Sequence, residues 1–198
     1  MDLLGKLFGS QARVKILRLF LLNPLDVFDA LTVSAKSKVQ IQEARRELAL
    51  LKASGVIAEK SFVKKAGTKS KRVPGFQLKG TFPLLSPLKN LIVSETPLNR
   101  DEIGRRLRGV GKIKFLTISG IFLSEPDARV DILIVGDELK KRSIEAVLRS
   151  IEAEIGKELS YGLMETAEFL YRINAYDKFV RDILDFKHDT IIDRLGVE

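Results

Sequence analysis

The stretch that decides the fold of the first half of the chain is residues 38–55, KVQIQEARRELALLKASG. Its apolar side chains recur at the spacing of one helical face, at Ile41, Ala44, Leu48 and Leu51. The stretch closes with Ser54-Gly55, and glycine is the residue that most often follows the end of a helix. The pattern therefore predicts a helix over residues 39–53 with one face buried and the other exposed.

The segments on either side of this helix predict the remaining elements of a small domain. Helical patterns precede it over residues 11–22 and about 25–32. Strands are predicted after it over residues 56–63 and 72–78, joined by a charged loop at residues 64–71. Three helices followed by a hairpin with a basic tip predict a winged helix-turn-helix domain.

The exposed side of the central helix and the hairpin carry the side chains expected to contact DNA. Arginine can bond guanine and glutamine can bond adenine in the major groove, whereas lysine mostly contacts phosphate. The central helix and the residues before it contribute Lys38, Gln40, Gln42, Arg45 and Arg46. The hairpin contributes cations suited to phosphate or minor-groove contact, namely Lys64, Lys65, Lys69, Lys71 and Arg72.

Positive charge is concentrated in the first half of the chain. Residues 1–93 hold 17 basic and 6 acidic residues, whereas residues 94–198 carry a net charge of −3, within a total of +8. This asymmetry predicts two domains, at residues 1–95 and 96–198, of which the first binds a polyanion. Charge alone does not distinguish DNA from RNA or from an anionic membrane surface.

Composition excludes several classes of protein and site. The chain of 198 residues contains no Cys and a single His, His188, so thiolate sites, disulfides and histidine clusters are excluded. No apolar run approaches the ~18 residues that a membrane span needs, and the first residues do not form a signal peptide. We expect a cytoplasmic protein that needs no cofactor and has no membrane partner.

Residues 9–13 read GSQAR, which matches a phosphate-binding motif of nucleotidyltransferases. That chemistry needs a strand with paired carboxylates shortly afterwards, and an apolar helical pattern follows here instead. We therefore interpret Ser10 as the N-cap of the helix over residues 11–22, where its oxygen accepts a hydrogen bond from a first-turn amide.

The second half of the chain mixes strand and helix patterns, which predicts an α+β domain. The first half ends with a helix expected over residues 82–93, a linker is expected at residues 94–97, and the second half begins with a helix expected over residues 99–108. After them the patterns predict strands at 113–122 and 129–135, a helix at 138–155, a strand at 158–164, and helices at about 166–170 and 174–186.

Glycine and arginine gather between residues 104 and 111. Because no strand precedes Gly109-Val110-Gly111 and no helix follows it in the expected way, it does not predict a dinucleotide-binding loop. Two interpretations stay open for Arg105, Arg106 and Arg108: they extend the basic surface, or they solvate a helix.

Several stretches of the first half resemble ArsR-type winged-helix regulators, namely LFGSQARVKIL at residues 7–17, RRELALLKASGVI at 45–57, GFQL at 75–78 and FPLL at 82–85. The resemblance covers about residues 5–93 and implies a dimeric DNA-binding regulator. Metal sensing, which is common in that family, is not expected, because its Cys and clustered His ligands are absent.

Residues 112–198 resemble a minimal nucleotidyltransferase domain, on ISGIF at 118–122, VDILIVGD at 130–137 and AYDKFVRDIL at 175–184. An active member of that family carries Gly-Ser, then Asp-x-Asp, then a third carboxylate on a neighbouring strand. These oxygens hold two magnesium ions that bind triphosphate and activate the attacking hydroxyl.

Transferring that pattern to this chain gives an incomplete site. Gly120 stands in place, but the serine position is Ile121, and the first carboxylate position is Arg129. Asp131 matches the second carboxylate, and Glu158 is the nearest candidate for the third. A guanidinium beside a single carboxylate predicts an Arg129–Asp131 ion pair. The resemblance therefore implies a domain that has lost catalysis.

The sequence as a whole predicts a sequence-specific transcriptional regulator that binds double-stranded DNA as a homodimer. For the second domain, oligomerisation, binding of a nucleotide or other small-molecule effector, and recruitment of a partner all stay open. One alternative is an active, magnesium-dependent nucleotidyltransferase that modifies a small molecule or a protein. Another is an interaction adaptor whose binding ignores the hairpin cations.

Overall fold

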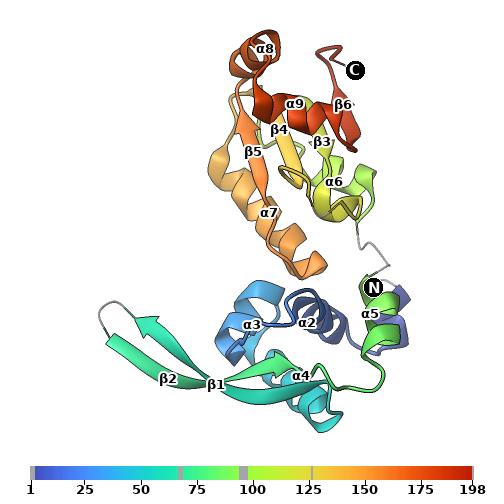
Figure 1. The fold of residues 1–198 in the computed structure, drawn as a ribbon, viewed down its shortest axis with the longest axis vertical. Helices are drawn as coiled ribbons and strands as arrows, with labels where there is room; N and C mark the ends of the chain where they lie inside the picture. Colours follow the sequence, from blue (N-terminus) through green and yellow to red (C-terminus); the bar gives the residue numbers. More distant parts are fainter. Residues whose placement is uncertain (1–2, 67–68, 94–97, 126, 198) are drawn as a thin grey trace. The chain divides into compact units, whose positions relative to one another are not determined.

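The chain forms two compact units, each of which contains helices and strands (Figure 1). The computed structural model describes residues 3–66, 69–93, 98–125 and 127–197, without the side chains of residues 65, 66 and 69. The first unit comprises Met1–Pro97 and Ser150–Lys157, and the second unit comprises Leu98–Arg149 and Glu158–Glu198. The expected α+β class is confirmed. The boundary and linker expected at residues 94–97 lie outside the described residues.

The first unit packs short helices together and adds a two-stranded hairpin. Its elements are α1 (Leu3–Leu7), α2 (Gln11–Leu22), α3 (Ala30–Ser37), α4 (Ile41–Ala53), β1 (Ile57–Ala66), β2 (Lys69–Leu78) and α5 (Leu85–Val93). Phe20 is fully buried in its core and meets Phe28 edge-on, with ring centroids 5.7 Å apart. The predicted cap of α2 is confirmed, because Ser10 Oγ accepts a hydrogen bond from Arg13 N at 3.0 Å.

The helix expected over residues 25–32 is wrong, since α3 begins only at Ala30. The side chain of Asp29 accepts a hydrogen bond from Thr32 N at 2.7 Å and caps the helix there. Just before it, Phe28 exchanges backbone hydrogen bonds of 3.0 and 2.8 Å with Phe76 of β2, which holds this segment extended. Capping and strand pairing, which apolar spacing does not reveal, decide where α3 starts.

The hairpin strands are longer than expected, so the charged loop predicted at residues 64–71 is largely wrong. Each strand has ten residues, and the register runs from Ile57↔Leu78 to Ala66↔Lys69. The outer part of the ribbon leaves its cations exposed at Lys64, Lys71 and Arg72 while the backbone stays paired. Charged side chains therefore do not prevent strand formation here, because they remain in water.

The second unit is built around a four-stranded mixed sheet with the strand order β5-β4-β3-β6. Its elements are α6 (Arg100–Arg106), β3 (Lys112–Ile118), the 3-10 turn η1 (Gly120–Phe122), β4 (Ile132–Asp137), the first part of α7 (Lys141–Ile155), β5 (Tyr161–Met164), α8 (Thr166–Asn174), α9 (Lys178–Asp185) and β6 (Asp189–Asp193). From Ser150 on, α7 belongs to the first unit. β4 runs parallel to β5, whereas β3 is antiparallel to β4 and β6. Phe115 and Phe169 stack in the core, 5.2 Å apart.

Several predicted boundaries in the second unit are wrong because local backbone geometry ends the apolar patterns early. β3 stops at Ile118, and Gly120 adopts a left-handed φ of +55° that starts η1 instead. Glu138 has a φ of 54°, so α7 begins at Lys141 rather than at residue 138. The short strand β6 was not predicted. None of the helices in the described ranges has the length and apolarity to cross a lipid bilayer.

Candidate nucleic-acid interface

The helix expected to read DNA is α4, and its inner face is fixed by burial. Ala44, Leu48 and Leu51 expose 0%, 1% and 4% of their surface, as the apolar spacing predicted. Glu47 is also buried, and its carboxylate pairs with Arg13 Nε of α2 at 2.7 Å. A charge-assisted bond at this depth sets the rotation of α4 against α2.

A tight junction sets the direction of α4 relative to α3. Lys38 takes a left-handed conformation with a φ of 50°, and Gln40 is the residue that precedes the first helical turn of α4. The hydroxyl of Ser34 donates to Val39 O at 2.7 Å, while Val39 N donates to Ser34 O at 3.2 Å. This pair of bonds makes the turn between the two helices rigid.

The outer face of α4 carries three of the predicted contact residues, and their side chains are not bound to other described residues. Gln42, Arg45 and Arg46 are exposed and make no hydrogen bond or ion pair with any residue that the structure describes. Lys38 and Gln40 are exposed as well, although they lie before the helix rather than on it. Three cationic or amide side chains on a rigid helix therefore face solvent, ready to donate hydrogen bonds.

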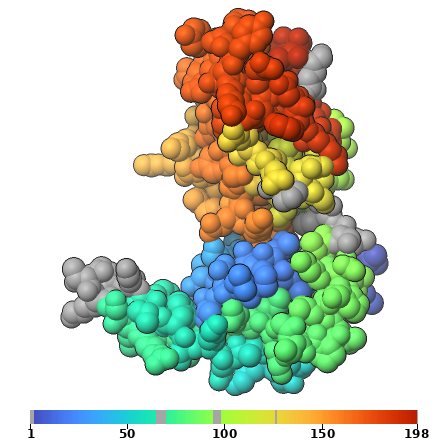
Figure 2. Space-filling model, viewed as in Figure 1, coloured from blue at the N-terminus to red at the C-terminus, as the bar shows by residue number. Residues whose placement is uncertain are grey.

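The hairpin extends away from the helices of the first unit (Figures 1 and 2). Lys71 lies directly across from Lys64, on the same face of the ribbon, and Arg72 lies across from Val63 on the other face. The side chains of Lys71 and Arg72 have no partner in the described part of the chain. The side chains of Lys65 and Lys69 lie outside the described residues. Positive charges that lie opposite each other on a strand pair repel one another, and an anionic partner would relieve this repulsion.

One acidic group anchors the hairpin to the helices. Lys64 Nζ lies 2.6 Å from Asp29 Oδ2, the same carboxylate that caps α3. Burial raises the pKa of Asp29, but the hydrogen bonds from Lys64 and Thr32 outweigh it, so the pKa lies below its ordinary value of 3.8. Lys64 was predicted as a DNA contact; the structure gives it this structural role as well. The N-cap rule, applied to Asp29, could have found the site from sequence.

Replacing Asp29 with alanine should lower the free energy of unfolding by about 1 kcal/mol or more at neutral pH, because the cap and the ion pair are lost. Since folding lowers this pKa, the contribution is complete above the unfolded-state pKa and disappears as the pH falls through the folded-state value. Urea unfolding across the acidic range measures it, with Asp29→Asn as a control that keeps the cap. A stability difference that stays constant throughout that range would contradict the assignment.

Two of the residues matched to the nucleotidyltransferase pattern, Gly120 and Asp131, lie in a hydrogen-bonded cluster with Ile121 and Ser160, which we call the clasp. Asp131 Oδ1 accepts a hydrogen bond from Ile121 N at 2.8 Å, and Oδ2 accepts bonds from Ser160 N and Oγ at 2.8 and 2.9 Å. Gly120 lies so close that a Cβ at this position would overlap Asp131 Oδ1. Both carboxylate oxygens are thus committed to backbone and hydroxyl donors.

The ion pair expected between Arg129 and Asp131 is wrong. Arg129 instead binds Asp182 of α9, with both Nε and Nη2 lying 2.6 Å from Asp182 Oδ2. Among the residues described, no group of three or more Asp, Glu, His or Cys side chains comes close enough to hold a metal, so Glu158 does not complete a site. These residues do not fit a pair of magnesium ions. Both oxygens of Asp131 already accept hydrogen bonds, and Arg129 places a positive charge at the position of the first carboxylate.

Comparisons with known proteins identify no relative: no protein-family model, no curated protein and no solved structure matches the chain.

Proposed function

We propose that the first unit is a winged helix-turn-helix that binds double-stranded DNA, and that the protein regulates transcription. One observation carries the proposal: Gln42, Arg45 and Arg46 are exposed on α4 without partners among the described residues, while the opposite face of the helix is buried. An α-helix fits the major groove, where arginine and glutamine discriminate bases. α3, the turn at Lys38 and α4 supply the corresponding helix-turn-helix order.

The hairpin supports the same proposal as a wing beside this helix. Lys52 at the end of α4 pairs with Glu59 of β1 at 2.7 Å, so the two elements are linked across their junction. Unpaired cations on the ribbon then contact phosphates or the minor groove, which positions the domain without reading sequence.

Salt dependence tests the assignment of the wing. Replacing both Lys71 and Arg72 with alanine should flatten the plot of log K against log salt concentration, by about 0.9 for each phosphate that the protein no longer neutralises. Fluorescence anisotropy with a labelled duplex measures this slope. The double variant Lys79→Ala/Lys89→Ala removes the same charge at exposed positions outside the hairpin and should keep the slope. Duplex binding with an unchanged slope would favour the adaptor alternative, and so would no binding at all.

We extend the proposal to a homodimer, because one winged helix makes few base contacts and paired half-sites raise specificity. Exposed leucines outside the proposed DNA face support this, with Leu7 of α1 exposed at 67% and Leu84 before α5 at 62%. Light scattering should report a dimer that becomes monomeric in the variant Leu7→Glu/Leu84→Glu. A wild-type monomer at all concentrations would contradict the extension.

For the second unit we propose a nucleotidyltransferase-like domain that does not transfer nucleotides. The bonds that clasp Asp131 and the pairing of Arg129 with Asp182 support this proposal, because the atoms that an active site would use on magnesium are bound within the chain. A role in regulation then requires a ligand or partner that binds elsewhere on the unit.

A further inference from the structure

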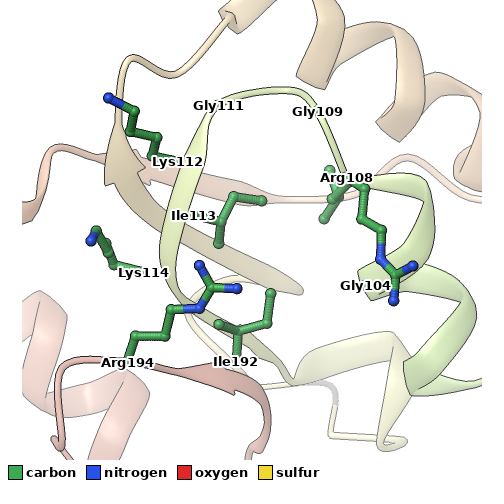
Figure 3. A pocket seen from close by; sticks show the side chains of 10 residues that line it. Gly104, Arg108, Gly109, Gly111, Lys112, Ile113, Lys114, Ile192 and Arg194 are labelled. Atoms are coloured by element: carbon green, nitrogen blue, oxygen red, sulfur yellow. The ribbon is translucent and has the colours of Figure 1, made fainter.

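A cavity of about 460 Å³ opens in the second unit at the start of β3, away from the residues discussed so far (Figure 3). Its walls come from the end of α6 with the turn that follows, from the first residues of β3, and from the end of β6. This volume lies within the range of about 300–1,000 Å³ that is usual for small-molecule sites.

The floor of the cavity is apolar. Leu107 is fully buried, Ile113 exposes only 7% of its surface, and Ile192 of β6 is half-buried. Gly104, Gly109 and Gly111 line the cavity as well and carry no side chain that could cover this floor. A planar or aliphatic group could therefore rest on the floor without displacing protein atoms.

The rim of the cavity is cationic. Arg108, Lys112, Lys114 and Arg194 line it, and none of its described lining residues is acidic. Lys112 is committed to Glu138 at 2.5 Å, but Arg108, Lys114 and Arg194 have no side-chain partner in the described ranges. In Figure 3 the guanidinium group of Arg194 lies beside Ile113 and Ile192 and Arg108 lies across from it, whereas the side chain of Lys114 extends from β3 away from these residues.

This arrangement is unfavourable without a ligand and favourable with an anion. Like charges held around one concavity repel one another, and low-dielectric walls focus their field into the space between them. Arginine matches the oxygens of a phosphate with parallel hydrogen bonds, and lysine adds a point charge. The combination of unpaired cations above an apolar floor is therefore suited to a phosphate attached to an organic group.

We infer that this cavity binds a small organic phosphate, with the phosphate between Arg194 and Arg108 and the organic group on Ile113 and Ile192. A duplex is disfavoured as the occupant, because its phosphates follow a convex backbone that does not enter a concave pocket. The cavity is also separate from Asp131: it lies at the first residue of β3 and the clasp follows the last, about 20 Å apart at ~3.3 Å per residue.

Protein-observed NMR titration of the full chain with phenyl phosphate tests the inference. We expect saturable shifts gathered at residues 104–114 and 192–194, and weaker binding of inorganic phosphate, which lacks the group for the floor. Arg194→Ala and Arg108→Ala should each raise Kd about tenfold, the effect of removing one charge-assisted bond. The spectrum of each variant without ligand should differ from that of the wild type only near the substituted residue, which shows that a loss is not caused by misfolding.

The matched control is Arg181→Ala, which removes an exposed arginine of α9 that does not line the cavity. The inference is overturned by an absence of saturable binding, by shifts gathered elsewhere, or by an equal loss in Arg181→Ala. A short duplex that moves the cavity resonances where phenyl phosphate does not would overturn it as well. Because the titration with phenyl phosphate contains no DNA, its outcome is independent of the DNA-binding proposal, and the duplex is titrated separately.

Discussion

Replacing Arg45 and Arg46 together with alanine should weaken binding to the preferred duplex by about 30-fold or more. Each arginine that forks onto a guanine contributes about 1–3 kcal/mol of discrimination, so the loss of about 2 kcal/mol requires only one such arginine. Binding to unrelated duplexes should fall much less, since only phosphate attraction remains there. Selection of bound fragments from random duplex DNA supplies the preferred site, and anisotropy measures both affinities.

The matched control for this variant is Lys6→Ala/Lys89→Ala, which removes the same charge from exposed positions on α1 and α5. It should weaken specific and non-specific binding equally and by only a few-fold. If the arginine variant lost no more specificity than this control, α4 would not be the reading helix, and the proposal would lose the observation that carries it.

The outer face of α4 could be predicted from sequence because its inner face is strongly constrained. Ala44, Leu48 and Leu51 repeat at helical spacing, so the positions between them had to be exposed. The length of the hairpin could not be predicted in this way. Its outer residues are solvated on both faces, so no alternation between buried and exposed side chains marks the strands.

The partners of Asp131 and Arg129 could not be predicted, because they are distant in sequence. Ser160 follows Asp131 by 29 residues, and Asp182 follows Arg129 by 53. Arg129 and Asp131 are two residues apart, which on an extended segment places both side chains on one face, but packing decides whether they pair. The packing of β5 and α9 supplied better partners for both.

The cavity of the second unit was missed for a related reason. Its cations come from the turn after α6, from β3 and from β6, and β6 was not predicted at all. Because β6 was not predicted, nothing in the sequence placed Arg194 next to β3. Arg108 could then be interpreted only as part of the basic surface or as a residue that solvates a helix. A binding site assembled from strand ends becomes visible only when the sheet order is known.

Asp131→Ala should lower the free energy of unfolding of the second unit by about 2–3 kcal/mol. The change removes the acceptor for Ile121 N and for both donors of Ser160, and unsatisfied donors cost about 1–3 kcal/mol each where water does not replace the missing partner. Ser160 is exposed, so water replaces part of the lost bonding and limits the loss. Urea unfolding followed by fluorescence of a probe in the second unit measures this loss. Asp182→Asn should cost only about 1 kcal/mol, because the Arg129 side of that ion pair is half exposed and water screens it.

This prediction separates a clasp from a catalytic carboxylate, because the two give opposite signs. A carboxylate kept for metal binding is held among groups that do not satisfy it, so its removal leaves stability unchanged or raises it. Asp131 is surrounded by donors, so its removal should destabilise. An increase in stability in Asp131→Ala, together with a rise in the melting temperature of the wild type on adding magnesium and ATP, would restore the nucleotidyltransferase alternative. Asp131→Asn adds a finer test, because it keeps one acceptor oxygen but places an amide nitrogen among donors. We expect its loss in free energy of unfolding to lie between those of Asp182→Asn and Asp131→Ala.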